Sequence, residues 1–199
     1  MSHRRWRPPT RVDAAAGAAA ALIERKRSIA PDDEVGIVSY DGGTTIVQRP
    51  VQLASDHQRL MEALSQMKIG SGTSISAGLR EARRALFPAS HPGWLDRLLG
   101  DRIPHRNEPS NHRVRRIVLL TDGHHNSGLC PKSIARALKR AGVCIDCVGI
   151  GGSPSDVDEN LLREIALSYP DGSKRYRWIG DSEKLVQHFQ TLAGRIARS

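Results

Sequence analysis

The segment that most constrains the fold is an uninterrupted run of aliphatic residues from Ile117 to Leu120, which stands between Arg116 and the pair Thr121-Asp122. A strand with one face in water alternates apolar and polar side chains, whereas an uninterrupted apolar run is typical of a strand that is covered on both faces. Helices packed on both faces of a parallel sheet provide that cover. The run therefore predicts a central parallel strand over residues 116–121.

Strands and helices are expected to alternate along the rest of the chain. Periodicity and turn signals predict strands over residues 34–40, 44–48, 143–150 and 174–179, and helices over residues 11–28, 56–67, 74–87, 131–141, 158–168 and 182–197. The turn Asp41-Gly42-Gly43 makes the first two of these strands antiparallel. The expected fold class is α/β, a doubly wound, mostly parallel sheet with helices on both faces.

Length and composition indicate one globular domain over residues 1–199. Hydrophobic residues make up 39% and charged residues 26% of the chain, which argues against disorder. Residues 88–113 combine prolines, histidines and arginines without any apolar period. We therefore expect an irregular basic insertion there, on the surface of the domain.

The net charge of +9 is concentrated near the start and in the middle of the chain. Basic clusters can indicate nucleic acid or an anionic membrane as the partner. Aromatic residues, on which bases stack in single-strand binders, make up only 4% of the chain. We therefore expect solvated arginine-rich loops, and a nucleic-acid or anion binder is the alternative function. The arginines concerned are Arg4, Arg5, Arg7 and Arg11, then Arg97, Arg102, Arg106, Arg113, Arg115 and Arg116.

The cysteines do not form a disulfide framework, because there are three of them. Cys144 and Cys147 lie three apart on a predicted strand, so their side chains point to opposite faces and cannot share a metal or a disulfide. Small core residues are the favoured interpretation. An odd number of cysteines favours a reducing, cytoplasmic location, and the alanine-rich run over residues 13–23 is too short to span a membrane.

Motifs for catalysis are missing from the sequence, so the chain is not expected to be an enzyme. The GIGG segment at residues 149–152 does not have the spacing of a dinucleotide-binding fingerprint, and the glycine loop at residues 70–73 lacks the lysine of a P-loop. No GxSxG elbow is present. His124 and His125 offer nitrogen ligands to a transition metal, but without a specific third ligand a solvent-facing pair is the preferred interpretation.

Asp122 is the best functional landmark. Binding residues of such folds lie in the loops that leave the carboxyl ends of the strands, which here are Tyr40-Asp41, Asp122-Gly123 and residues 149–152. An unpaired buried carboxylate is costly, so Asp122 should face a cation, a helix N-terminus or water. The hydroxyl of Thr73, in the glycine loop, is a credible second oxygen ligand for a hard cation. The alternative is that Asp122 only caps the next turn.

Four segments resemble the von Willebrand factor A domain family in their order and spacing. They are DEVGIVSY at residues 33–40, IGSGTSISAGL at residues 69–79, IVLLTDG at residues 117–123 and VGIG at residues 148–151. The resemblance covers nearly the whole chain and implies a doubly wound sheet with a metal-ion-dependent adhesion site at its carboxyl edge. In that family an Asp-x-Ser-x-Ser motif, a threonine and an aspartate hold Mg²⁺.

The threonine and the aspartate carry over onto Thr73 and Asp122. The same edge implies partner-binding roles for Ser71, Tyr40, Asp41, Gly123 and His124. The Asp-x-Ser-x-Ser motif and the first, central strand are absent from this sequence. Two ligands alone do not make a tight Mg²⁺ site, because that ion requires nearly octahedral oxygen coordination.

Two hypotheses explain the missing strand. In the first, Met1 corresponds to a methionine inside the family's sequence, so that the chain is truncated and upstream in-frame codons encode an apolar strand with the motif. In the second, the metal site is lost and a partner's strand completes the domain. Either way, the open edges of two apolar strands need a neighbour.

The function implied by the resemblance is that of a protein-binding module. Family members bind an acidic residue of the partner, whose carboxylate completes the coordination of the ion. Bacterial cytosolic members often serve MoxR-type AAA+ ATPases or chelatase subunits, so the expected partner is another protein of this kind.

Overall fold

A computed structural model describes residues 10–42, 44–67, 72–88 and 114–196 of the chain. The predicted insertion at residues 88–113 lies outside these residues except for Pro88, and Ser71 also lies outside them. The helices are α1 (Arg11–Ile29), α2 (Leu53–Ser65), α3 (Ile75–Leu86), α5 (Lys132–Arg140), α6 (Glu159–Ile165) and α7 (Ser182–Ile196). The strands are β1 (Glu34–Tyr40), β2 (Thr44–Gln52), β3 (Arg116–Thr121), β4 (Cys144–Ile150) and β5 (Tyr176–Ile179).

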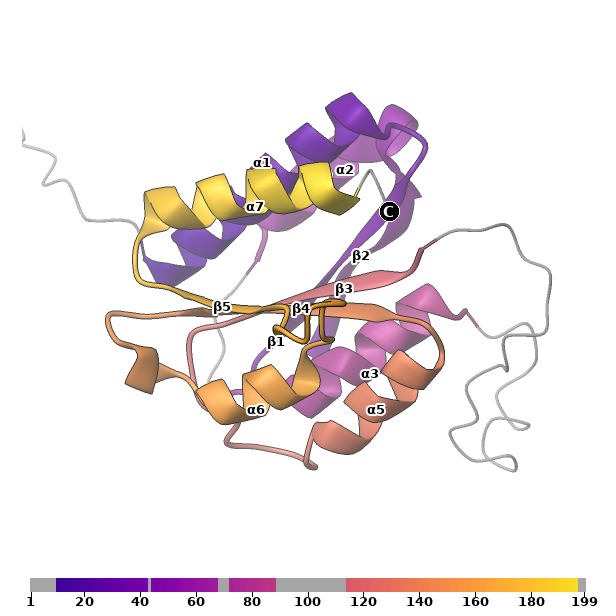
Figure 1. Ribbon diagram of the computed structural model, residues 1–199. Coiled ribbons are helices and arrows are strands. Elements are labelled where there is room, and N and C mark those ends of the chain that lie inside the picture. The colour runs from indigo at the N-terminus through magenta and orange to yellow at the C-terminus, as the bar shows by residue number, and fades with distance from the viewer. Residues whose placement is uncertain (1–9, 43, 68–71, 89–113, 197–199) are drawn as a thin grey trace, which may run out of the picture.

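The strands form the middle layer of a three-layer α/β fold, which confirms the expected fold class (Figure 1). One face is covered by α1, α2 and α7, and the other by α3, α5 and α6. The second strand begins at Thr44 as predicted but continues to Gln52, and the helix after it begins at Leu53, three residues before the predicted start. None of the helices in the described ranges is long and apolar enough to cross a membrane.

Strand pairing divides the middle layer into two parts. β3, β4 and β5 are parallel in that order, with Leu119 opposite Cys147 and Cys147 opposite Tyr176. β1 and β2 form an antiparallel hairpin in which Tyr40 pairs with Thr44. Among the described residues no strand lies between β1 and β3, and the hydroxyl of Tyr40 donates a hydrogen bond across to the Leu120 carbonyl at 2.7 Å.

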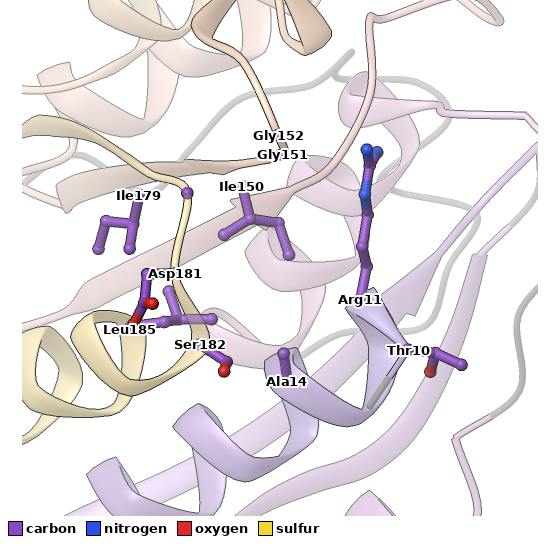
Figure 2. Close-up of a pocket in the computed structure, with 11 residues that line it drawn as sticks. Thr10, Arg11, Ala14, Ile150, Gly151, Gly152, Ile179, Asp181, Ser182 and Leu185 are labelled. Carbon is purple, nitrogen blue, oxygen red and sulfur yellow. The ribbon is translucent and has the colours of Figure 1, made fainter. Parts of the chain in front are cut away.

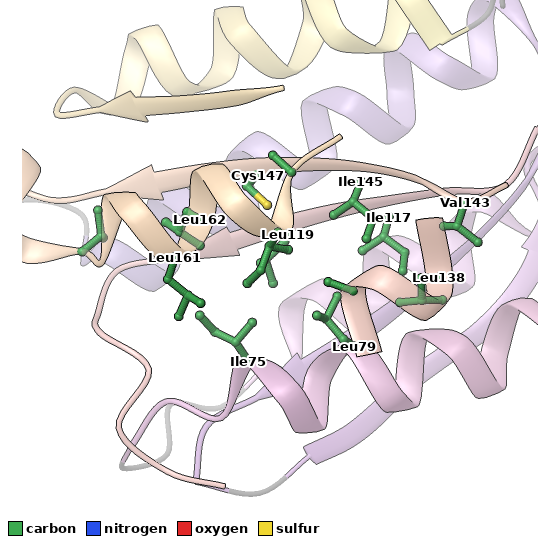
Figure 3. Close-up of a cluster of buried hydrophobic side chains, with 14 residues drawn as sticks. Ile75, Leu79, Ile117, Leu119, Leu138, Val143, Ile145, Cys147, Leu161 and Leu162 are labelled. Carbon is green, nitrogen blue, oxygen red and sulfur yellow. The ribbon is translucent and has the colours of Figure 1, made fainter. Parts of the chain in front are cut away.

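The core is densest around β4, where all seven residues are buried. Ile145 and Cys147 point into the cluster formed with α3, α5 and α6 (Figure 3). Val148 and Ile150 lie on the other face of the sheet, in the cluster formed with α1 and α7. Cys144 and Cys147 are buried free thiols, as predicted. Burial raises the pKa of both thiols, so they stay protonated and behave as small core residues.

Helix α1 begins where the sequence predicts. Thr10 and Asp13 form a reciprocal capping box, and the Thr10 side chain accepts from the Asp13 amide at 3.2 Å. The Thr10 hydroxyl and the Thr10 amide both donate to the Asp13 Oδ2, at 2.7 and 2.9 Å, and hold the pKa of this carboxyl below its usual range. The helix ends before Pro31, and the buried Lys26 forms an ion pair with Asp33. This pair fixes the turn that leads into β1.

The expectation of solvated arginines is wrong for Arg116. Its side chain is only 8% exposed and its guanidinium lies 2.7 Å from the Asp146 carboxylate on β4. Arg175 approaches the same carboxylate at 3.5 Å. Arg115, which directly precedes Arg116, stacks over the Phe87 ring with 4.7 Å to the ring centroid. These arginines at the start of β3 are packed into the fold because partners far along the chain neutralise or cover them.

Candidate functional site

Three loops meet at the carboxyl ends of β1 and β3. Asp41 follows β1, Thr73 precedes α3, and Asp122 follows β3. The Asp41 carbonyl accepts a hydrogen bond from the Ser74 amide at 2.6 Å, which ties the end of β1 to the start of α3. The Asp122 side chain is exposed and that of Thr73 is half-buried. The edge predicted from the sequence is therefore a real meeting point of loops.

Asn126 joins Thr73 to the loop of Asp122. The backbone amide of Thr73 donates to the side-chain Oδ1 of Asn126 at 2.8 Å, and the backbone amide of Asn126 donates to the Thr73 carbonyl at 3.1 Å. A Cβ atom at Gly123 would lie 3.2 Å from the Thr73 Oγ1, so the backbone beside Asp122 passes close to this hydroxyl. The structure thus brings the Thr73 and Asp122 segments together. We call the pair of hydrogen bonds the Thr73–Asn126 clasp.

Sequence reasoning missed Asn126. An amide side chain in a polar loop gives no sign of its partner, and this partner lies 53 residues away in the chain. The one available signal was its position, four residues after Asp122 in the same loop.

The loop after β3 is also tied to its surroundings by its two histidines. His125 Nδ1 accepts from the Ile75 amide at 3.3 Å, and its Nε2 lies 3.1 Å from the Leu129 carbonyl. An accepting Nδ1 and a donating Nε2 require the neutral ring. His125 therefore satisfies the first turn of α3 and does not simply face solvent. His124 is exposed, and its Nε2 lies 2.9 Å from the Ser155 carbonyl.

Arg11 places a positive charge at the same edge. Its Nη1 donates to the Asp122 carbonyl at 3.3 Å, and its Nη2 lies 3.0 Å from the Asp156 Oδ2. The side chain extends from the first turn of α1 toward the loop with Gly151 and Gly152 (Figure 2). It lines a pocket of about 290 Å³ between the starts of α1 and α7. The sequence interpretation placed Arg11 in a solvated cluster and did not connect it to the site.

Tyr40 points into the fold beneath this edge. A Cβ at Gly78 of α3 would lie 2.9 Å from the tyrosine ring, so the ring packs directly on that helix. Burial raises the pKa of the phenol, which stays a hydrogen-bond donor to the Leu120 carbonyl. The partner-binding roles of Tyr40, Asp41, Gly123 and His124 remain predictions.

The donors fit a divalent cation only in part. The Thr73 hydroxyl and the Asp122 carboxylate are hard oxygen ligands of the kind that Mg²⁺ prefers, and Mg²⁺ sites commonly keep several waters. Within the described part of the chain, no three histidine, cysteine, aspartate or glutamate side chains converge on one point. The residues therefore suit a weakly held, largely hydrated ion and not a tight site.

Comparison with known proteins gives a consistent picture of the fold. Residues 1–125 match the family model described as von Willebrand factor type A domain. Proximal thread matrix protein 1 from the mussel byssus superposes with a TM-score of 0.67 at 17% identity, over 92% of this chain and 41% of that chain. This chain thus spans about two fifths of the mussel protein. A further structure of the mussel protein carries a zinc-occupied MIDAS motif.

Two bacterial proteins have the same fold. BatB from Bacteroides thetaiotaomicron superposes with a TM-score of 0.64 at 18% identity, over 96% of this chain and 90% of that chain. The pilus adhesin SpaC from Lactobacillus rhamnosus GG superposes with a TM-score of 0.65 at 14% identity, over 94% of this chain and 28% of that chain. No curated protein sequence matches the chain. At these identities the superpositions establish the fold alone.

Proposed function

Because the chain belongs to the von Willebrand factor type A domain family, we propose that it is a protein-binding module and not an enzyme. Its binding surface is the carboxyl edge of β1 and β3, around Thr73 and Asp122. The observation that supports this proposal most is the Thr73–Asn126 clasp, which holds a hydroxyl beside the loop of an exposed carboxylate. The similar pilus adhesin and matrix protein support a binding role by analogy.

The recognised group is an acidic side chain of the partner. Thr73 and Asp122 would hold a hydrated Mg²⁺, which supplies a positive charge with coordination positions for a carboxylate. Arg11 adds a second positive group, because its guanidinium lies against the Asp122 carbonyl. Guanidinium groups form strong, directional hydrogen bonds to carboxylates. The exposed Asp122 loop, with Gly123 and His124, would form the contact surface together with Asp41.

The partner that we propose is an AAA+ ATPase of the MoxR type or a chelatase subunit in the cytoplasm. Binding should be tested by surface plasmon resonance with the purified MoxR-type ATPase of the same organism. We expect binding in millimolar Mg²⁺, loss of binding in EDTA, and weakening of at least about tenfold by Asp122→Ala and by Thr73→Val.

The matched control is Asp32→Asn, which neutralises an exposed carboxylate near the opposite end of β1 and should leave the affinity unchanged. The proposal fails if EDTA and Asp122→Ala both leave the affinity unchanged. A nucleic-acid or anion binder, the alternative function, predicts instead a steep loss of affinity with salt and no effect of EDTA.

A further inference from the structure

A basic groove lies at the β5 edge of the sheet, between β5 and α7. Its volume is about 660 Å³. It is separate from the Asp122 loop, since no residue of that loop lines it. The lining residues that matter are Arg177 and Trp178 of β5, and Lys184, His188, Thr191 and Arg195 of α7.

The groove follows the open edge of β5. Three consecutive residues of β5, 177–179, line it, and side chains of a strand alternate between the two faces of a sheet. One groove can contact all three only if it runs along the edge of the strand. Among the described strands, β5 pairs with β4 alone. The main-chain N–H and C=O groups on its other edge are therefore available to pair with a further strand.

Three exposed cations flank the groove. Arg177, Lys184 and Arg195 are exposed, and no carboxylate of the described chain forms an ion pair with any of them. The one acidic lining residue is Asp181, whose Oδ1 already accepts from the Lys184 amide at 2.9 Å. His188 lines the groove together with Arg177 and Arg195, and burial and then the charges of these two arginines lower its pKa. The groove is therefore positively charged along its length.

The geometry points to an extended, acidic segment of another protein as the ligand of this groove. Lys184 and Arg195 are eleven positions apart on α7, which is about 16 Å along a helix. An extended peptide of about five residues covers that distance. Its main chain pairs with the open edge of β5, and its carboxylates meet the three cations.

The chemistry of the groove favours a peptide over nucleic acid. The rings in the lining are those of Trp178 and His188, and both residues are half-buried, so no row of exposed rings is present on which bases can stack.

Fluorescence anisotropy tests the inference with a fluorescein-labelled octapeptide of alternating valine and glutamate. The chain should bind it, and the same peptide with glutamine in place of glutamate should bind at least about tenfold more weakly. The double variant Arg177→Glu/Arg195→Glu should weaken binding of the acidic peptide by at least about tenfold, because like charges then face each other. Thr191→Trp should also weaken it, because a large side chain fills the groove without a change of charge.

Arg140→Glu is the matched control, since Arg140 is exposed at the end of α5 on the other side of the sheet. It should change the affinity by less than about twofold. All titrations are made in EDTA, which removes the cation that the proposed function requires, so that Asp122→Ala should also have no effect and binding at this groove is measured separately. The inference is overturned if Arg140→Glu weakens binding as much as the groove variants do. It is also overturned if the wild-type chain does not bind the peptide, or if single-stranded oligothymidylate displaces it at lower concentrations than unlabelled peptide.

Discussion

β4 and β1 are both seven-residue, largely apolar strands, yet every residue of β4 is buried and none of β1 is. β4 has a strand on each side and a layer of helices on each face. β1 pairs with β2 alone among the described residues, and its other edge faces β3 across the side chain of Tyr40. An apolar pattern in the sequence therefore indicates a strand, whereas the strands and helices around that strand decide how deeply it is buried.

The candidate site is formed by segments of both regions, the one around β4 and the one around β1. Asp122 continues from β3, which is paired with β4, whereas the segment of Thr73 is held by the Asp41 carbonyl at the end of β1. A site built across a well-packed and a less well-packed region depends on the hydrogen bonds that join them. The Thr73–Asn126 clasp is therefore as important to the site as the two oxygen donors.

The largest expected effect concerns the buried charges next to β3. Asp146→Ala should lower the free energy of unfolding by about 3–5 kcal/mol, because it removes the carboxylate between Arg116 and Arg175. Arg59→Ala, which breaks an exposed ion pair with Asp56 on α2, should cost at most about 1 kcal/mol. Urea unfolding followed by circular dichroism measures both. Equal losses would contradict the difference between the two regions.

A pair of isoleucines compares the two strands directly. Ile145→Ala in β4 should cost about 2–5 kcal/mol, since the side chain is fully buried in the core and leaves a cavity. Ile37→Ala in β1 should cost about 1 kcal/mol, because this side chain is half-buried and loses less apolar contact. Both variants can be followed by the same urea titration. A loss at Ile37 as large as that at Ile145 would show that β1 is packed as tightly as β4.

A smaller effect is expected at the contact between β1 and β3. Tyr40→Phe keeps the ring on α3 and removes the hydroxyl that donates to the Leu120 carbonyl. The loss in the free energy of unfolding should be about 1 kcal/mol. Tyr169→Phe, which alters a tyrosine stacked under Arg175 at 4.2 Å, is the control and should have a smaller effect. If Tyr40→Phe has no effect, this hydrogen bond does not hold the two regions together.

The smallest effect is a pH dependence at His188 of α7, the helix that packs on β4. The pKa of His188 is lowered by burial and by Arg177 and Arg195, while Asp146 acts in the opposite direction. The unfolded chain binds a proton on this ring near pH 6.5, whereas the folded chain does so only at lower pH. Stability is therefore complete above about pH 6.5 and falls as the pH drops toward the lowered pKa. His188→Gln should reduce the loss in the free energy of unfolding that is measured between pH 7.5 and 5. If the loss is the same in this variant as in the wild-type chain, other groups cause it.

Much of the fold follows from the sequence because it rests on local patterns. The apolar run at β3, the capping residue Thr10 and the turn after Tyr40 each act on neighbours in the chain. The burial of Arg116 was not predictable, since its partner Asp146 lies 30 residues away. The spacing of residues within one segment also does not predict which strands will have an unpaired edge among the described residues.

The candidate site was predictable in its main residues and not in its supports. Thr73 and Asp122 were identified from the resemblance and from their positions at strand ends. Asn126 and Arg11 were missed because their contacts are made only when distant loops and the start of α1 come together. Polar side chains in loops have many possible partners, and the three-dimensional arrangement selects one of them.

If Thr73 and Asp122 form one cation-dependent binding edge across the two regions, paramagnetic Mn²⁺ should bind beside both residues. A Mn²⁺ titration followed by ¹H–¹⁵N NMR spectra measures this binding. Selective broadening of the Thr73, Gly123 and Asn126 amide signals is expected, with loss of that broadening in Asp122→Ala and weaker broadening in Asn126→Ala. Broadening that spreads equally over acidic residues elsewhere, or that persists in Asp122→Ala, would show that no cation site exists at this edge.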